Sequence, residues 1–567
     1  MLLSLDNSVV YVYNVGMYVR TITRKNKNRP DVTYIQLAHN VRDKKTGQVK
    51  ANVLYSFGRA DQLDVAAIQR LVRSLSRFLS PEEMLQAQGE GDGVLKFLWS
   101  RPLGGAWVLR RLWERLGLKQ VIKEALRDRA FSLPVEWAIF AMVANRALAP
   151  SSKRAIEEWV REDVALGNDE EIKVQHLYRA MDFLLAHEEA IQREVFFATA
   201  DLLNLEVDLL FFDTTTSYFE LDEEDDEKGL RHYGLSKDKR VDLPQVVIGL
   251  AVTKEGIPVR SWVFSGNTTD TTTVEMVQRD LAGWRLGRCV WVMDRGMVSE
   301  GNRIILRRAG GHYILGEKLR GKEKANQAAL SRPGRYRVVR DNLRIKEVIV
   351  GEGTHRRRYV VVHNPEEATR DKLTRQRILA RLEEEIAALG NLRGQRHNKA
   401  VCTLIAHPTL GRYLKQLKSG ALRIDRGKVR VEERLDGKYL LTSSDESLTA
   451  EEIALGYKQL LEVERAFRSL KQTLELRPMY HRKDERIRTH VTLCWLALLL
   501  VRIIEKKTGE SWEKTRRVLE RIHHGEFATK DGRILQRTEL TREQEQILKG
   551  LGIKPPPEVE KVKLVTP

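Results

Sequence analysis

Two aspartates each follow a hydrophobic run that is typical of a buried β-strand. Asp213 comes directly after the run 209–212, and Asp294 after the run 290–293. If these strands are neighbours in one sheet, both carboxylates project from the same edge and can share hard cations such as Mg²⁺, which prefer oxygen ligands. Two such ions activate a water and stabilise the leaving oxygen of a phosphodiester. An aspartate after a strand is also a common turn former, but the repeated pattern favours a metal site.

A helix predicted over residues 450–471 offers a third carboxylate, that of Glu464. At about 100° per residue, seven residues return to within about 20° of the starting direction, so Tyr457, Glu464 and Lys471 share one stripe. A phenol, a carboxylate and an ammonium on one stripe suit a metal ligand flanked by phosphate contacts. The alternative is an exposed helix face with an ordinary Glu–Lys pattern.

The elements that must position these acids form an α/β pattern from residue 206 onward. A strand hairpin is predicted over 246–264, helices over 273–284 and 300–308, and a further strand over 312–315. The order strand, hairpin, helix, strand, helix, strand predicts a mixed sheet with helices on its faces.

The chain ahead of this pattern divides into two parts. Within residues 1–95, two β-prone runs at 32–37 and 53–57 predict a β-hairpin, followed by a helix over 64–79. Residues 96–205 are helical in pattern and carry many arginines on their polar faces. Such a surface is either an ordinary solvated bundle or a DNA-binding one, and we expect DNA binding.

A basic segment over residues 319–444 interrupts the α/β pattern. It is predicted to be a β-rich insertion with a helical hairpin, and a charged helix is expected over 371–389. Arg335 and Arg337 alternate along one predicted strand and so face one side, which favours a surface that follows DNA phosphates. Residues 511–567 are expected to be a C-terminal tail that ends in an extended, proline-rich stretch.

Composition limits the class of protein. The 567 residues include 97 Lys and Arg against 78 Asp and Glu, a net charge of +19 that favours a polyanionic partner. Cys289, Cys402 and Cys494 form no CxxC pair, which speaks against a disulfide framework or a structural zinc site and indicates a reducing compartment. The longest apolar run, 491–501, is too short to span a membrane and predicts a buried helix.

These motifs together resemble the DDE transposases of bacterial insertion sequences, in the group with a Tyr-x2-Arg-x3-Glu-x6-Lys signature. Asp213, Asp294 and the helix with Tyr457, Glu464 and Lys471 carry the resemblance. Three further segments are similar to that group: His-Tyr-Gly-Leu-Ser-Lys-Asp-Lys-Arg-Val-Asp-Leu-Pro-Gln at 232–245, Asp-Arg-Gly at 294–296 and Leu-Arg-Pro-Met-Tyr-His-Arg at 476–482. The resemblance runs from about residue 17 to residue 540.

The resemblance implies an RNase H-like mixed sheet with flanking helices, interrupted by the insertion and preceded by the hairpin and helical parts. Residues 206–318 and 445–510 would form the catalytic domain. Asp213, Asp294 and Glu464 would hold two Mg²⁺ ions, with Mn²⁺ able to substitute. The activity implied is cleavage at transposon ends and strand transfer into target DNA, in cut-and-paste transposition.

The partners implied are double-stranded DNA, as terminal inverted repeats and as target, and a second copy of the chain in a homodimer on the DNA. Tyr457 and Lys471 would contact phosphates of the transposon end. No membrane partner is expected, and a cytoplasmic, nucleoid-associated location follows. Residues 1–16 precede the Met-Tyr-Val-Arg near which related sequences tend to begin, and are interpreted as an upstream extension.

One position departs from the signature, because Leu460 stands where the group has arginine. Arg465 and Arg468 lie nearby as candidate phosphate contacts. The departure leaves the metal chemistry untouched and leaves open whether a hairpinned DNA end forms. Two alternatives also stay open: a metal-dependent nuclease without strand transfer, and a non-cleaving DNA-binding protein of element ends.

Overall fold

The computed structural model describes residues 17–25, 30–42, 47–80, 83, 96–127, 134–167, 170–203, 205, 208–221, 223–284, 286, 289–308, 310–320, 323–353, 356–529 and 532–564. The chain divides into two units. The first consists of Met1–Phe97, Phe527–Arg533 and Lys563–Pro567. The second consists of Leu98–Glu526 and Ile534–Val562, and it contains the predicted catalytic residues. Residues 1–16, interpreted above as an extension, lie outside the described residues.

The described residues of the first unit include an antiparallel sheet followed by a helix. Its elements are β1 (Met17–Arg24), β2 (Val32–Arg42), β3 (Val49–Arg59) and α1 (Val65–Ser76). The hairpin of β2 and β3 and the helix after it confirm the sequence prediction. Strand β1 was not predicted, although it is rich in β-favouring residues, and it pairs along its whole length with β2. Asp64 caps α1 by accepting a hydrogen bond from the Ala67 amide at 2.9 Å.

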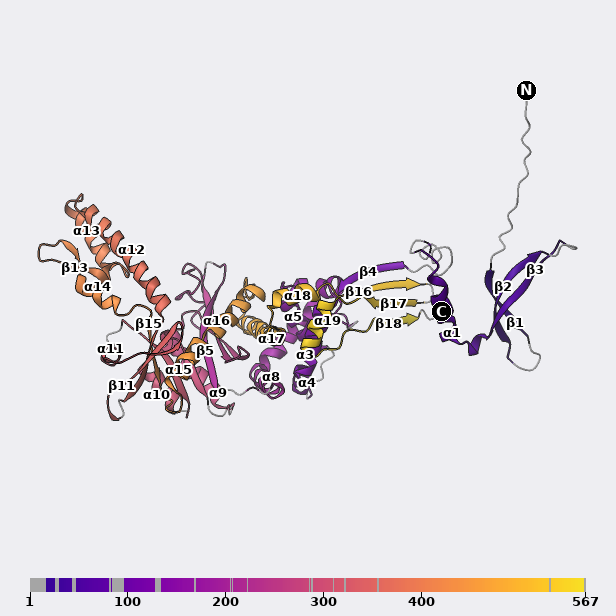
Figure 1. Cartoon of the computed structure of the whole chain (residues 1–567), viewed down its shortest axis with the longest axis horizontal. Coiled ribbons are helices and arrows are strands. Elements are labelled where there is room, and N and C mark those ends of the chain that lie inside the picture. Colours follow the sequence, from indigo (N-terminus) through magenta and orange to yellow (C-terminus); the bar gives the residue numbers. More distant parts are fainter. Residues whose placement is uncertain are drawn as a thin grey trace, which may run out of the picture. The chain divides into compact units, whose positions relative to one another are not determined.

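The second unit is built on a nine-stranded mixed sheet of order β10-β11-β12-β15-β9-β8-β5-β6-β7 (Figure 1). Five strands form its catalytic half: β5 (Leu209–Tyr218), β6 (Gln245–Thr253), β7 (Pro258–Ser265), β8 (Val290–Met293) and β9 (His312–Glu317). β6 runs antiparallel to β5 and β7, while β8 is parallel to both β5 and β9. This strand order and orientation are those of an RNase H-like fold, which confirms the predicted fold class.

Helices cover both faces of this half of the sheet. They are α9 (Asp270–Ala282) and α10 (Glu300–Arg308) on one face and α15 (Ala450–Lys458), α16 (Leu461–Arg468) and α17 (Asp484–Thr508) on the other. Successive strand residues face opposite sides. Phe211 therefore packs in the core with α16 and α17, and Phe212 packs in the core with α9.

The strands of the insertion continue the same sheet. They are β15 (Lys438–Ser443), β12 (Arg357–His363), β11 (Leu343–Val350) and β10 (Arg337–Arg340). β15 pairs antiparallel with β9, placing Leu440 opposite Glu317. The rest of the insertion has a small core of its own, built from α12 (Pro365–Leu389), α13 (Gly394–Ala406), β13 (Leu414–Gln416), β14 (Leu422–Ile424) and α14 (Arg426–Glu433).

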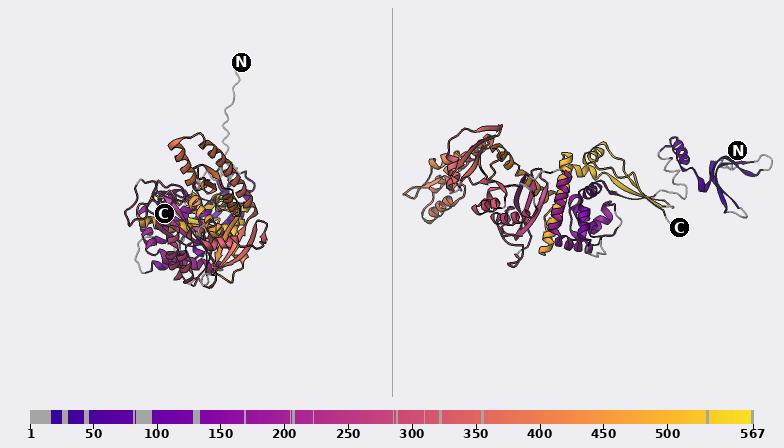
Figure 2. Two further views of the ribbon diagram at one scale, coloured as in Figure 1. Left: turned by 90° about the vertical axis from the view of Figure 1, so that its left-hand side faces the viewer. Right: turned by 90° about the horizontal axis from the view of Figure 1, so that it is seen from below.

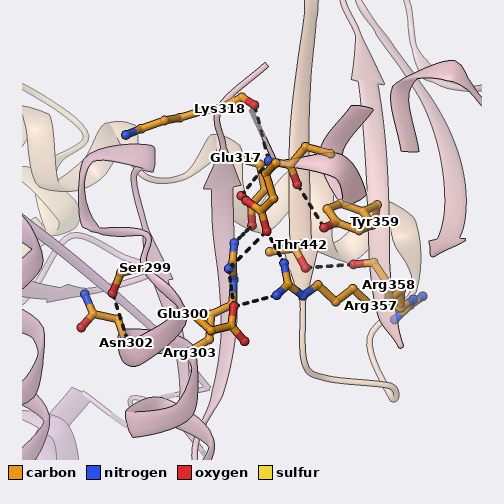
Figure 3. A network of polar contacts seen from close by, with 12 residues as sticks. Ser299, Glu300, Asn302, Arg303, Glu317, Lys318, Arg357, Arg358, Tyr359 and Thr442 are labelled. Carbon is orange, nitrogen blue, oxygen red and sulfur yellow. Dashed lines mark hydrogen bonds and ion pairs between the residues drawn. The ribbon is translucent and has the colours of Figure 1, made fainter. Parts of the chain in front are cut away.

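A buried polar network ties the insertion to the catalytic half (Figure 3). The Glu317 carboxylate, on β9, accepts hydrogen bonds from Arg303 Nη2 at 2.5 Å and from Asn326 Nδ2, on α11 (Lys324–Ser331), at 3.2 Å. Tyr359 Oη, on β12, donates to Asn326 Oδ1 at 3.0 Å. Because Glu317 is buried, this paired arrangement is needed to satisfy its charge.

The helical part packs against α17. It contains α3 (Gly104–Arg115), α4 (Leu118–Ala125), α5 (Val135–Leu148), α6 (Lys153–Glu158), α7 (Val174–Ala186) and α8 (Glu188–Leu203). Figure 2 shows α17 alongside α5. α17 is long and apolar enough to cross a membrane by length and composition, but 89% of its most apolar window is buried inside the protein. It is therefore the predicted buried helix.

The segment expected to be a C-terminal tail contains regular structure. Its elements are α18 (Trp512–Leu519), β16 (His523–Thr529), β17 (Gly532–Arg537), α19 (Arg542–Leu551) and β18 (Val559–Leu564). The three strands form a four-stranded sheet with β4 (Lys96–Pro102). Trp512 is buried, and its Nε1 donates to the Ala147 carbonyl at 2.9 Å. This segment folds because it supplies core residues to the helical part.

Candidate active site

The structure brings Asp213 and Asp294 to neighbouring strands. β5 and β8 are parallel with Phe212 opposite Met293, so the two aspartates follow a matched pair in the register. Asp294 comes directly after β8, as predicted. Asp213 lies inside β5, which continues to Tyr218 instead of ending at the acid. Both side chains are half-buried.

Asp213 is surrounded by polar groups. Its Oδ1 accepts a hydrogen bond from the Thr214 amide at 2.7 Å and lies 3.4 Å from Lys237 Nζ. Burial raises the pKa of the Asp213 carboxyl, and the charges of Asp270 and Asp294 add to this rise while Lys237 opposes it. The charges of Asp270 and Asp294 therefore act on the Asp213 carboxyl.

Lys237 and Asp270 are two residues of this site that the sequence reasoning missed. Lys237 Nζ donates to the Thr214 carbonyl and to Thr214 Oγ1, both at 2.7 Å, and lies 3.4 Å from Asp270 Oδ2. Thr214 Oγ1 in turn donates to Asp270 Oδ1 at 2.5 Å. Lys237 belongs to the segment 232–245, which offered a signal, whereas Asp270 begins α9 and follows no strand, so its spacing offered none.

Asp294 is held by Tyr457. Tyr457 Oη donates to Asp294 Oδ1 at 2.9 Å, and its ring stacks on Tyr439 with centroids 5.9 Å apart. Burial, followed by the charge of Asp294, raises the pKa of the Tyr457 phenol, so the phenol stays a hydrogen-bond donor. A Cβ at Gly316 would lie 2.2 Å from Tyr457 Oη, so glycine is required there for the close approach.

The helix predicted over 450–471 is interrupted by a short turn at Gln459 and Leu460. α15 ends at Lys458, α16 begins at Leu461, and a π-helical turn follows at Ser469–Thr473. Leu460, in the break, keeps a helical backbone conformation and is buried in the core. Tyr457 and Glu464 therefore lie on consecutive helices, and their shared stripe stays a prediction.

Glu464 is exposed on α16, and α16 packs against β5. Its neighbour Glu462 points elsewhere, as the sequence indicated, and pairs with Arg502 Nη2 and Arg465 Nη1, each at 2.6 Å. Glu464 forms no ion pair with any residue that the structure describes. Within the described ranges, no three His, Cys, Asp or Glu side chains lie close enough together to hold a metal ion.

The predicted DNA-contacting cations fall into two groups. Lys471 is paired, with its Nζ 2.9 Å from Asp238 Oδ1, and burial lowers the pKa of its ammonium. Arg477 Nη1 also lies 2.9 Å from Asp238. Arg465 is paired with Glu462, whereas Arg468 is exposed and makes no ion pair within the described residues.

The two arginines of the insertion lie at the edge of the nine-stranded sheet. Arg335 precedes β10, so it lies outside the strand in which it was expected. Arg337 begins β10, is exposed, and its Nη2 lies 3.1 Å from Glu451 Oε2. Both side chains reach solvent.

The donor chemistry of the site suits a hard divalent cation. Asp213, Asp294 and Glu464 provide only oxygen donors, as Mg²⁺ and Mn²⁺ prefer. The Asp213 carboxylate also pairs with a positive charge in this structure, the ammonium group of Lys237. These residues therefore fit a divalent ion by chemical type.

Two known families match the sequence. The N-terminal domain of the IS1634 family transposases matches residues 19–87. The transposase DDE domain matches residues 212–500, which is more than half of the chain. The chain belongs to the DDE transposases of insertion sequences. The resemblance is thereby confirmed, and the transposase is an enzyme of phosphodiester cleavage and transesterification.

No curated protein matches the transposase. Among solved structures, it is similar to the piggyBac transposase in a synaptic complex with hairpin DNA, at 11% sequence identity and a TM-score of 0.33, over 73% of this chain and 78% of that chain.

Proposed function

We propose that this transposase cuts the ends of its element and transfers the freed strands into target DNA, in cut-and-paste transposition. The observation that supports this most directly is the placement of Asp213 and Asp294 on the paired parallel strands β5 and β8, inside the region that matches the DDE domain. Glu464 on α16, which packs against β5, completes the proposed set of acids.

In the proposed site, Asp213, Asp294 and Glu464 hold two Mg²⁺ ions, with Mn²⁺ as a substitute. When bound, such ions supply an activated water and stabilise the leaving oxygen of the phosphodiester. The chain fixes the geometry: the β5–β8 pairing sets the spacing of the two aspartates, and Tyr457 orients Asp294 through its hydrogen bond. The 3′-hydroxyl released by hydrolysis then attacks a phosphorus of target DNA, and a target 3′-oxygen leaves.

DNA phosphates are expected to contact exposed arginine and lysine side chains. Arg335 and Arg468 reach solvent and are available for such contacts, and Arg337 also reaches solvent but is paired with Glu451. Lys471 and Arg465 are paired with acids, so each contacts DNA only by exchanging its carboxylate partner for a phosphate. We further propose a homodimer on the DNA, because joining two ends requires two active sites, and a cytoplasmic, nucleoid-associated location.

The test uses supercoiled plasmid DNA that carries the DNA flanking the gene on both sides, where terminal inverted repeats are expected. We expect Mg²⁺-dependent cleavage at the repeats and joined products, and loss of both in Asp294→Ala. The proposal is wrong if Asp294→Ala cuts as well as the parent. Cleavage without joining indicates a nuclease, and tight binding of the repeats without cleavage in Mg²⁺ or Mn²⁺ indicates a non-cleaving DNA-binding protein.

A further inference from the structure

An ammonium group lies between two carboxylates at the proposed active site. Lys237 Nζ is 3.4 Å from Asp213 Oδ1 and 3.4 Å from Asp270 Oδ2. Two hydrogen bonds to Thr214, each 2.7 Å long, fix its position. Asp213 and Asp270 therefore share one cation, although Asp270 is not among the three acids of the signature.

Asp270 is also close to the Asp294 side of the site. A Cβ at Gly296, two residues after Asp294, would lie 3.2 Å from Asp270 Oδ2. Thr214 Oγ1, beside Asp213, donates to the other carboxylate oxygen. The Asp270 carboxylate thus lies between the chain around Asp213 and the chain after Asp294. Its side chain is 29% exposed and that of Asp213 is 22% exposed, so solvent ions reach both.

A lysine ammonium carries one charge on a flexible stem and can be displaced. A divalent cation carries twice that charge and takes several oxygen ligands at once. It therefore interacts with a pair of carboxylates more strongly than the lysine does, provided that both carboxylates are within reach.

We propose that Asp270 is a fourth acidic ligand of the catalytic metal site, and that Lys237 is a built-in counter-ion that competes with the divalent cation for the Asp213–Asp270 pair. This inference rests on the proposed function, because it assumes that Asp213 binds metal. The Lys237 ammonium neutralises the two carboxylates and holds them in place in the absence of metal. When the divalent cation binds, it displaces the ammonium from them.

The test measures Mn²⁺ binding to the full-length transposase without DNA, by the electron paramagnetic resonance signal of free Mn²⁺. Asp270→Asn is expected to weaken Mn²⁺ binding by on the order of tenfold or more. Lys237→Met is expected to tighten it, because the competing charge is gone. Glu275→Gln is the matched control, since Glu275 is an exposed acid of the same helix that pairs with Arg279, and this variant should bind as the parent does.

Each outcome decides the inference. If folded Asp270→Asn binds Mn²⁺ like the parent, Asp270 is not a ligand. If Lys237→Met binds Mn²⁺ as tightly as the parent or more weakly, Lys237 does not compete with the metal for the Asp213–Asp270 pair, and the proposal is wrong. This second variant keeps the proposal testable if Asp270→Asn does not fold. Asp213→Asn distinguishes failure of the proposed metal site from failure of the role given to Asp270. If Asp213→Asn binds Mn²⁺ like the parent, the proposed metal site itself is wrong. If Asp213→Asn loses Mn²⁺ binding while Asp270→Asn keeps it, only the role of Asp270 is wrong.

Discussion

Tyr457→Phe removes one hydroxyl and tests whether Tyr457 acts through Asp294 or through DNA. The signature assigns this tyrosine to the transposon-end phosphates, whereas in the structure its Oη donates to Asp294 Oδ1 at 2.9 Å. The phenylalanine ring keeps the stacking on Tyr439. The substitution therefore removes the hydrogen bond and little else.

The size of the effect follows from this contact. A hydrogen bond to a charged group contributes about 1.5–3 kcal/mol, and the half-buried Asp294 places this bond near the lower end. Since about 1.4 kcal/mol corresponds to tenfold in rate, we expect cleavage at the ends to slow by roughly tenfold if Asp294 loses its fixed orientation. Affinity for end DNA should stay unchanged, because Tyr457 contacts no phosphate in this account.

The assay is single-turnover cleavage of end DNA at saturating transposase, with affinity measured separately by fluorescence anisotropy. Gly316→Ala provides an independent check, since its Cβ would lie 2.2 Å from Tyr457 Oη and push the hydroxyl away from Asp294. We expect it to slow cleavage as Tyr457→Phe does, and the double variant to lose less than the two separate losses combined. Weaker DNA binding by Tyr457→Phe, with a parental cleavage rate at saturation, would refute the reasoning.

Three further predictions concern buried or paired charges. Burial lowers the pKa of the Lys153 ammonium to about 7, so the protein loses stability as pH falls from about 10.5 to 7. Lys153→Met should therefore raise the urea midpoint at pH 7, and this gain should shrink towards pH 10. An unchanged urea midpoint at pH 7 would contradict the prediction. Burial lowers the pKa of His481 to about 4, so stability present above pH 6.5 is lost as pH falls towards 4, and His481→Gln should show a shallower acid decline of the urea midpoint. Asp238→Asn frees Lys471 from its ion pair, so binding to end DNA should strengthen and depend more steeply on salt, which titrations at several salt concentrations check.

The catalytic half of the fold could be predicted because its signals are local. α10 has the predicted bounds 300–308, and α17 contains the apolar run 491–501 that predicted a buried helix. The first four residues of β5 and the whole of β8 are short apolar runs, which is typical of strands buried on both faces. The two acids could be found for the same reason, since each follows such a run.

The rest could not be predicted because it depends on contacts between distant parts of the chain. The break at Gln459 and Leu460 leaves the buried face of the helix in phase, so the apolar periodicity gives no sign of it. The strands of the insertion join the catalytic sheet through the pairing of β15 with β9. Trp512 attaches the C-terminal segment to the helical part through its hydrogen bond to the Ala147 carbonyl. Asp270 meets Lys237 only when α9 and the segment 232–245 come together on β5.

The central claim is that Asp213, Asp294 and Glu464 form one catalytic centre for both cleavage and joining. The most direct measurement compares Asp213→Asn, Asp294→Asn and Glu464→Gln with the parent in two reactions, cleavage of intact ends and joining of pre-cut ends to target DNA. We expect each variant to keep its folded far-ultraviolet circular dichroism spectrum and its affinity for end DNA while losing both reactions. A folded variant of any of the three that cuts and joins at the parental rate would contradict the claim.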